Sequence, residues 1–145
     1  MDPLPPNFVI VTLGVSDLDR SIAFYAGLGW EQRGDPSQGI AWFRTSGSWV
    51  GLFPVADLAA DVGLSISEAG TATKSATYAV NLASEAAVDA GFATVRELGA
   101  RVVKEPTTLE WGGYSGYFED PDGHLWELCF NPGFPIDDEG RIEIP

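Results

Sequence analysis

The chain has 145 residues, of which 45% are hydrophobic and 20% are charged. This balance is typical of a folded globular protein, and the length corresponds to one domain or to two small ones that share a core. Eight Lys and Arg against 21 Asp and Glu give a net charge of −13. We therefore expect no binding to nucleic acid or to an anionic membrane surface, because both require positive side chains. The negative electrostatic field of the protein favours cationic or neutral ligands.

The chain contains one cysteine, Cys129, and one histidine, His124. A single cysteine excludes an internal disulfide, and these two residues alone do not make a zinc finger or a two-histidine metal clamp. The N-terminal segment lacks the basic start and the apolar stretch of a signal peptide. No apolar run approaches the roughly 18 residues of a membrane helix. We therefore expect a cytoplasmic protein.

The first half predicts a strand, a helix and three short strands. Residues 8–15 are apolar and β-branched, which is typical of a buried strand. Ser16 is the expected N-cap of a helix that ends near Ala26, where Gly27 follows. Turn-forming residues separate the three strand candidates that come next, which are 30–33, 40–44 and 49–53.

The second half repeats this order after a predicted linker at 55–75, which is expected to hold a short helix near 55–62. Ser84 is the expected cap of the second helix, which ends near Leu98. Asp-Pro-Asp-Gly at 120–123 predicts a hairpin turn between the last two strands. The predicted strands of this half are 76–82, 101–104, 115–119 and 125–130.

The two halves also match residue by residue, at an offset that grows only where a loop would lengthen. The matched pairs are Val15 and Leu82 at 67 residues, Gly29 and Gly99 at 70, Phe43 and Phe118 at 75, and Leu52 and Leu128 at 76. The sequence therefore predicts an α+β fold of two repeated βαβββ modules that curl into a shared concave cavity. We assign module one to 7–54, the linker to 55–75, module two to 76–132 and an irregular surface tail to 133–145.

Three stretches, 11–30, 78–106 and 117–132, resemble the vicinal oxygen chelate superfamily of glyoxalase I, bleomycin-resistance proteins and extradiol dioxygenases. The last stretch, YFEDPDGHLWELCFNP, is the most specific of the three. Together with the repeat, the resemblance extends over nearly the whole chain. It implies the two-module fold and a ligand site on the concave side of the sheets.

Enzymes of this superfamily hold a divalent metal with side chains from four strands. The resemblance carries those positions to Ile10, Gly51, Thr77 and Glu127. An apolar side chain and a hydrogen atom donate no electron pair, and a hydroxyl is a poor ligand for Fe, Ni or Zn. One carboxylate does not make a tight site. We therefore expect neither a metal nor another cofactor.

Strand alternation and the repeat offsets place aromatic residues on the concave face. Trp111, in a glycine-rich loop, is expected to close one mouth. The alternative is that these rings only fill a core. Glu127 either pairs with Arg44 or stays available as a charge partner or general base. The candidate ligand-binding residues are Trp42, Arg44, Trp49, Phe53, Thr77, Trp111, Tyr117 and Glu127.

Two further residues have competing interpretations. His124 follows the hairpin turn and is expected on the solvent side, with ligand contact as the alternative. Cys129 shares a strand face with Glu127 and is expected to be a small core residue rather than a nucleophile.

The first functional hypothesis is a metal-free, drug-sequestering type of protein, associated with antibiotic resistance, that binds a small aromatic or cationic compound. The second is a metal-independent isomerase or lyase with Glu127 as the catalytic general base. A metal-dependent glyoxalase or dioxygenase and a module with a vestigial pocket remain as further alternatives. The resemblance also implies a homodimer.

Overall fold

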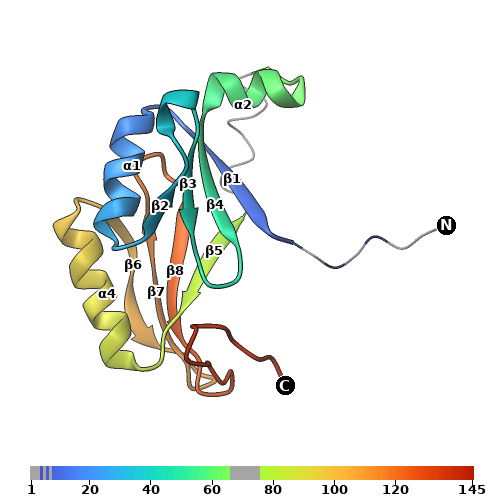
Figure 1. Cartoon of the computed structure of the whole chain (residues 1–145). Coiled ribbons are helices and arrows are strands. Elements are labelled where there is room, and N and C mark those ends of the chain that lie inside the picture. Colours follow the sequence, from blue (N-terminus) through green and yellow to red (C-terminus); the bar gives the residue numbers. More distant parts are fainter. Residues whose placement is uncertain (1–3, 5, 7, 66–75) are drawn as a thin grey trace.

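The computed structural model describes residues 4, 6, 8–65 and 76–145, and contains two four-stranded sheets (Figure 1). In each sheet the first strand lies parallel to the last, and the other pairs are antiparallel. The two predicted βαβββ copies are therefore confirmed. The first sheet has the order β1 (Ile10–Val15), β4 (Trp49–Pro54), β3 (Ala41–Arg44) and β2 (Glu31–Arg33). The second has the order β5 (Thr77–Asn81), β8 (Leu125–Phe130), β7 (Tyr114–Glu119) and β6 (Arg101–Thr108).

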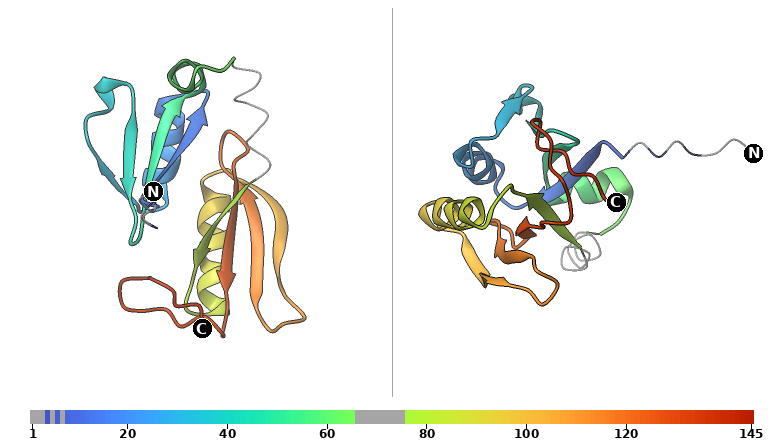
Figure 2. Two further views of the ribbon diagram at one scale, coloured as in Figure 1. Left: turned by 90° about the vertical axis from the view of Figure 1, so that its right-hand side faces the viewer. Right: turned by 90° about the horizontal axis from the view of Figure 1, so that it is seen from below.

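Helices α1 (Leu18–Gly27) and α4 (Glu85–Glu97) lie on one side of the two sheets, which leaves the opposite faces of both sheets free of them (Figures 1 and 2). Helix α2 (Val55–Val62) follows β4 directly, as the sequence predicted for the start of the linker, and η1 (Pro36–Gln38) is a single turn before β3. Within the described part of the chain, no helix is long and apolar enough to span a membrane.

The helix caps confirm one prediction and correct another. Ser84 caps α4, since its hydroxyl accepts a hydrogen bond from the Ala87 amide at 3.0 Å. Asp17, not Ser16, caps α1, by accepting from the Arg20 amide at 3.0 Å. The predicted cap was wrong by one residue because the amide and hydroxyl of Ser16 instead donate to Asp122, at 2.9 and 2.7 Å.

Several boundaries also differ from the predictions. β1 begins at Ile10 rather than at residue 8, and β6 continues to Thr108 rather than ending at Lys104. β6 is an edge strand with register shifts, a position where Pro106 is tolerated because no ladder bond is lost on its open side. The rest of the predicted linker, from residue 66 to 75, lies outside the described residues. An isolated bridge joins Ile136 to Ile142 within the predicted irregular tail.

The helix-covered faces of the two sheets share one hydrophobic core, which links the modules. Phe24 of α1 meets Phe118 of β7 with ring centroids 6.3 Å apart. Burial of such large apolar side chains supplies most of the driving force for folding. The largest fully buried members of the core are Tyr25, Phe43, Phe92, Phe118, Leu13 and Leu52.

The turn between β7 and β8 docks on α1 and joins the modules through polar contacts. The Tyr25 hydroxyl donates to Asp120 at 2.7 Å and accepts from the Trp126 indole nitrogen at 3.1 Å. His124 is only 2% exposed, so the predicted solvent-side position was wrong. Its Nε2 lies 2.7 Å from the Gly14 carbonyl oxygen, at the end of β1. The turn buries His124 because it packs against the other module rather than projecting into water.

Candidate functional site

The helix-free face of each sheet is here the face that points away from α1 and α4, and in the first sheet α2 packs at its Gly14 end. A row of three residues crosses this face of the first sheet. Thr12 of β1 and Trp42 of β3 both lie opposite Gly51 of β4. A Cβ added at Gly51 would lie 2.7 Å from Cζ3 of Trp42, so the indole ring rests directly on the glycine. The half-buried Trp42 is therefore held flat against β4, and it covers the place where a longer side chain at position 51 would stand.

The corresponding row in the second sheet is polar. Ala79 of β5 and Tyr117 of β7 both lie opposite Glu127 of β8. Partial burial raises the pKa of Tyr117, and the charge of the Glu127 carboxylate beside it raises it further. The phenol therefore keeps its proton at neutral pH and is a hydrogen-bond donor next to Glu127.

Arg44 does not share this row. No ion pair joins Arg44 and Glu127, both of which are described, so of the two alternatives for Glu127 the structure does not show the pairing with Arg44. Arg44 instead lies opposite Glu31 of β2.

Cys129 lies two residues beyond Glu127, in register with Asn81 and opposite Ser115. Its side chain is buried, as predicted for a core residue. Burial raises the pKa of the Cys129 thiol, and the charge of Glu127 raises it further. A protonated thiol is a weak nucleophile, so this environment does not activate Cys129.

The remaining candidate residues are spread over the molecule. Trp49 is half-buried between Ile10 and Arg44, and Phe53 lies opposite Gly14, where α2 packs on the strand. Thr77 is exposed at the start of β5. Trp111 is 57% exposed in the β6–β7 loop, where its ring folds over Gly113. The structure thus brings Trp42 onto Gly51 and Tyr117 onto Glu127, whereas Trp111 packs against its own loop.

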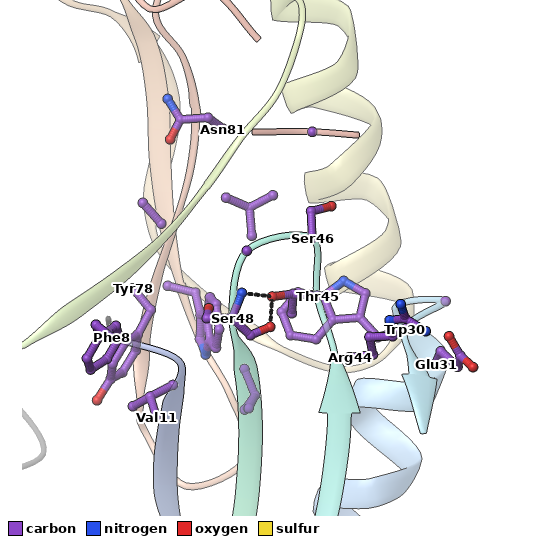
Figure 3. Close-up of a pocket in the computed structure, with 17 residues that line it drawn as sticks. Phe8, Val11, Trp30, Glu31, Arg44, Thr45, Ser46, Ser48, Tyr78 and Asn81 are labelled. Carbon is purple, nitrogen blue, oxygen red and sulfur yellow. Dashed lines mark hydrogen bonds between the residues drawn. The ribbon is translucent and has the colours of Figure 1, made fainter. Parts of the chain in front are cut away.

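A cavity of about 690 Å³ lies between the two modules (Figure 3). It shares Ala79 with the second row, and the other row residues do not line it. Of the residues predicted to bind a ligand, Arg44 lines it. Tyr78 and Trp126, which also border the cavity, were not among the candidates from the sequence. A cavity between modules depends on how the modules dock, which local periodicity does not encode. Its aromatic members are Phe8, Trp30, Tyr78 and Trp126, and its polar or charged members are Glu31, Arg44, Thr45, Ser46, Ser48 and Asn81.

The residues at the four metal positions do not fit a metal. Ile10 and Gly51 have no donor atom in their side chains, Thr77 has a weak one, and Glu127 supplies a single carboxylate. No cluster of three or more His, Cys, Asp or Glu side chains suited to a metal occurs among the residues that the structure describes. The donor chemistry therefore differs from that of the metal-dependent relatives.

Comparison with known proteins identifies the class. The model of the glyoxalase, bleomycin resistance protein and dioxygenase superfamily matches residues 7–128, so the chain belongs to this superfamily. A metallothiol transferase, FosB of Shouchella clausii, is 29% identical over 119 residues, which cover 81% of this chain and 75% of the relative.

Solved structures agree with this assignment. A glyoxalase-related enzyme from Fulvimarina pelagi is 30% identical with a TM-score of 0.85, and the match covers 96% of this chain and 98% of that one. A lactoylglutathione lyase from Agrobacterium tumefaciens is 18% identical with a TM-score of 0.64, over 88% of this chain and 95% of that one. The second likeness supports the fold alone.

Proposed function

We propose that this protein binds a small aromatic, preferably cationic compound on the helix-free faces of its sheets, without a metal, in the manner of a drug-sequestering protein. The position of Trp42 carries the proposal. Its ring lies on Gly51, one of the positions where metal-dependent members of the superfamily would place a ligand. An exposed indole face offers stacking and cation–π contact instead of an electron pair.

Glu127 gives the preference for a cation. It is half-buried on β8, opposite Tyr117 of β7, and its charge raises the pKa of that phenol. The net charge of −13 adds a favourable long-range field for a positive ligand. The same charge arithmetic disfavours nucleic acid and anionic membranes as partners.

We propose in addition that two copies of the chain associate. The start of the β1 region exposes three consecutive apolar side chains, with Phe8 78% exposed and Val9 and Ile10 each 44% exposed. The helix-free faces of both sheets point to the same side of the molecule (Figure 2). A second copy packed there would cover these side chains and enclose the rows of Trp42 and Glu127.

The test is calorimetric titration with two planar probes of similar shape, cationic 9-aminoacridine and neutral acridine at pH 7.5. We expect 9-aminoacridine to bind more tightly, and we expect it to be recovered chemically unchanged. Trp42→Ala should weaken both probes, whereas Glu127→Gln should remove the difference between them. Glu97→Gln, an exposed acid at the end of α4, is the matched control for charge. Equal binding of both probes by all variants would contradict the proposal.

The alternative function is a metal-independent isomerase or lyase. The pairing of Tyr117 with Glu127 across β7 and β8 favours it, because a neighbouring phenol and carboxylate can serve as acid and base. In that case Glu127→Gln should abolish turnover of an enolisable substrate and leave most of its affinity intact. A pure binding protein would show no turnover to lose.

A further inference from the structure

The cavity between the modules has the size of a small-molecule site. Its volume of about 690 Å³ lies within the roughly 300–1,000 Å³ typical of ligand pockets. One side is the β3–β4 hairpin of the first module, and the other is β5 of the second (Figure 3). Gly140 of the C-terminal segment also borders it, next to Ser46.

One wall of the cavity is aromatic and held in place. The rings of Trp30 and Trp126 meet edge to face with centroids 5.4 Å apart, and Tyr78 lies 5.2 Å from Trp126. Trp126 is 4% exposed, and its indole nitrogen is bonded to Tyr25. Rings fixed in this way offer a ready surface for a planar group, since little side-chain entropy is lost on binding.

The end of the cavity beside β2 carries the positive charge of Arg44, which forms no ion pair within 4.0 Å among the described residues. Arg44 lies opposite Glu31, but Glu31 is bonded to Arg33 at 2.7 Å. The hydrogen bond from Arg33 lowers the pKa of Glu31, and the charges of Arg33 and Arg44 lower it further. Two guanidinium groups therefore share one carboxylate.

Arg44 is unusual among the arginines of this chain. All six arginines are described, and five of them have a carboxylate within 4.0 Å, in the pairs Arg20–Asp122, Arg33–Glu31, Arg96–Glu105, Arg101–Glu119 and Arg141–Glu139. Within the described part of the chain Arg44 has no such partner. Arg44 is exposed and lines the cavity beside its aromatic wall, so its guanidinium is available to an anionic ligand.

The hairpin adds hydrogen-bonding groups near Arg44. Thr45 and Ser48 bond to one another across the turn, with the Ser48 amide donating to the Thr45 hydroxyl at 3.2 Å. This contact fixes the turn and leaves the hydroxyl of Ser46 at the rim (Figure 3). Asn81 contributes an amide from the side of β5.

We propose that this cavity binds a small planar aromatic carboxylate, with its ring against Trp30 and Tyr78 and its carboxylate on Arg44. A guanidinium fork matches a carboxylate in shape, and the pair forms two parallel hydrogen bonds. One uncompensated charge suits a monoanion, whereas neighbouring Glu31 would repel a doubly charged phosphate. This site does not rest on the function proposed for the helix-free faces, and it has the opposite charge preference.

The experiment is calorimetric titration with 2-naphthoate and its neutral counterpart 2-naphthamide. We expect 2-naphthoate to bind at least about tenfold more tightly, because charge-assisted hydrogen bonds are strong in such sites. Arg44→Gln should remove the difference, and Arg44→Lys should keep part of it. Arg96→Gln, which removes a paired arginine on α4, should leave both affinities unchanged.

Amide NMR shifts establish where the probe lies. The proposal expects the largest shifts at Ser46, Ser48 and Asn81. It is overturned if 2-naphthoate does not bind, if it binds no better than 2-naphthamide, or if Arg44→Gln has no effect. It is also overturned if the shifts centre on Glu127, since the probe would then occupy the helix-free face.

Discussion

The two modules present the same three-residue row with different chemistry. Thr12, Gly51 and Trp42 form it in the first sheet, and positions 67, 76 and 75 residues later, Ala79, Glu127 and Tyr117, form it in the second. Both rows keep an aromatic ring in the same place. The central residue sets the surroundings of the ring, because Trp42 rests on a glycine whereas Tyr117 lies opposite a carboxylate that raises its pKa.

This difference shows how one backbone frame can serve two binding chemistries. The first row offers a flat apolar surface, and the second an oriented negative charge. A metal-binding relative needs donors in both rows, and this chain keeps a carboxylate in one only. Substitutions in either row, or in the contact between the modules, test this comparison. The substitution with the largest expected effect comes first.

The largest effect is expected from Asp120→Ala. Asp120 is 4% exposed and accepts hydrogen bonds from the Tyr25 hydroxyl at 2.7 Å and the amides of Asp122 and His124 at 2.9 and 2.8 Å. Three buried donors would lose their acceptor, so we expect the free energy of unfolding to fall by about 3 kcal/mol or more. Chemical denaturation measures this loss. Asp138→Ala, in the exposed tail, should change it little, and equal losses in both variants would contradict the role of Asp120.

A smaller loss of stability is expected from Gly51→Ala. The new methyl group would lie 2.7 Å from Cζ3 of Trp42 and would push the indole off the strand. Overpacking of this kind costs about 1–3 kcal/mol, and the displaced ring should bind 9-aminoacridine more weakly. Gly47→Ala, where the added methyl meets nothing within 4 Å, is the control for the thermal midpoint. An unchanged midpoint and unchanged binding in Gly51→Ala would contradict the stacking of Trp42 on β4.

The effect of pH on the free energy of unfolding, through Tyr117 of the second row, should be smaller still. The pKa of Tyr117 is raised by burial and by Glu127, so the folded protein holds this proton at a pH where the unfolded chain has lost it. The contribution of the Tyr117 proton to stability is therefore fully present below the unfolded tyrosine pKa of about 10, and it declines as the pH rises above that value. Glu127→Gln should bring the pKa of Tyr117 down, as followed by tyrosine NMR. A pKa that stays the same would show that Glu127 does not act on this phenol.

Much of the arrangement of strands and helices could be predicted from the sequence, because the sequence signals for these elements are local. Strand alternation and hairpin lengths fix which residues lie opposite one another, so the offset that relates Leu52 to Leu128 also relates Gly51 to Glu127. The signals for where a helix begins and ends, such as the Ser84 cap and the glycine after each helix, are equally local. The choice between Ser16 and Asp17 as the cap of α1 was not, because it depends on Asp122, 106 residues away.

The contacts between modules were the part that the sequence did not reveal. Asp-Pro-Asp-Gly predicts a turn but not the surface on which the turn docks, so the burial of His124 against Gly14 was missed. The same holds for the cavity at Trp30 and Tyr78. These residues carry the apolar signature of a core strand, and only the docked arrangement leaves space beside them.

The central claim is that the first row has exchanged a metal ligand for an aromatic surface. The most direct measurement is the metal content of the purified, untagged protein, together with its thermal midpoint in the presence of Mn, Fe, Co, Ni or Zn. The account predicts metal far below one equivalent and no rise in the midpoint, because a tight site would stabilise the folded state by mass action. Stoichiometric metal with a clear rise in the midpoint would contradict it.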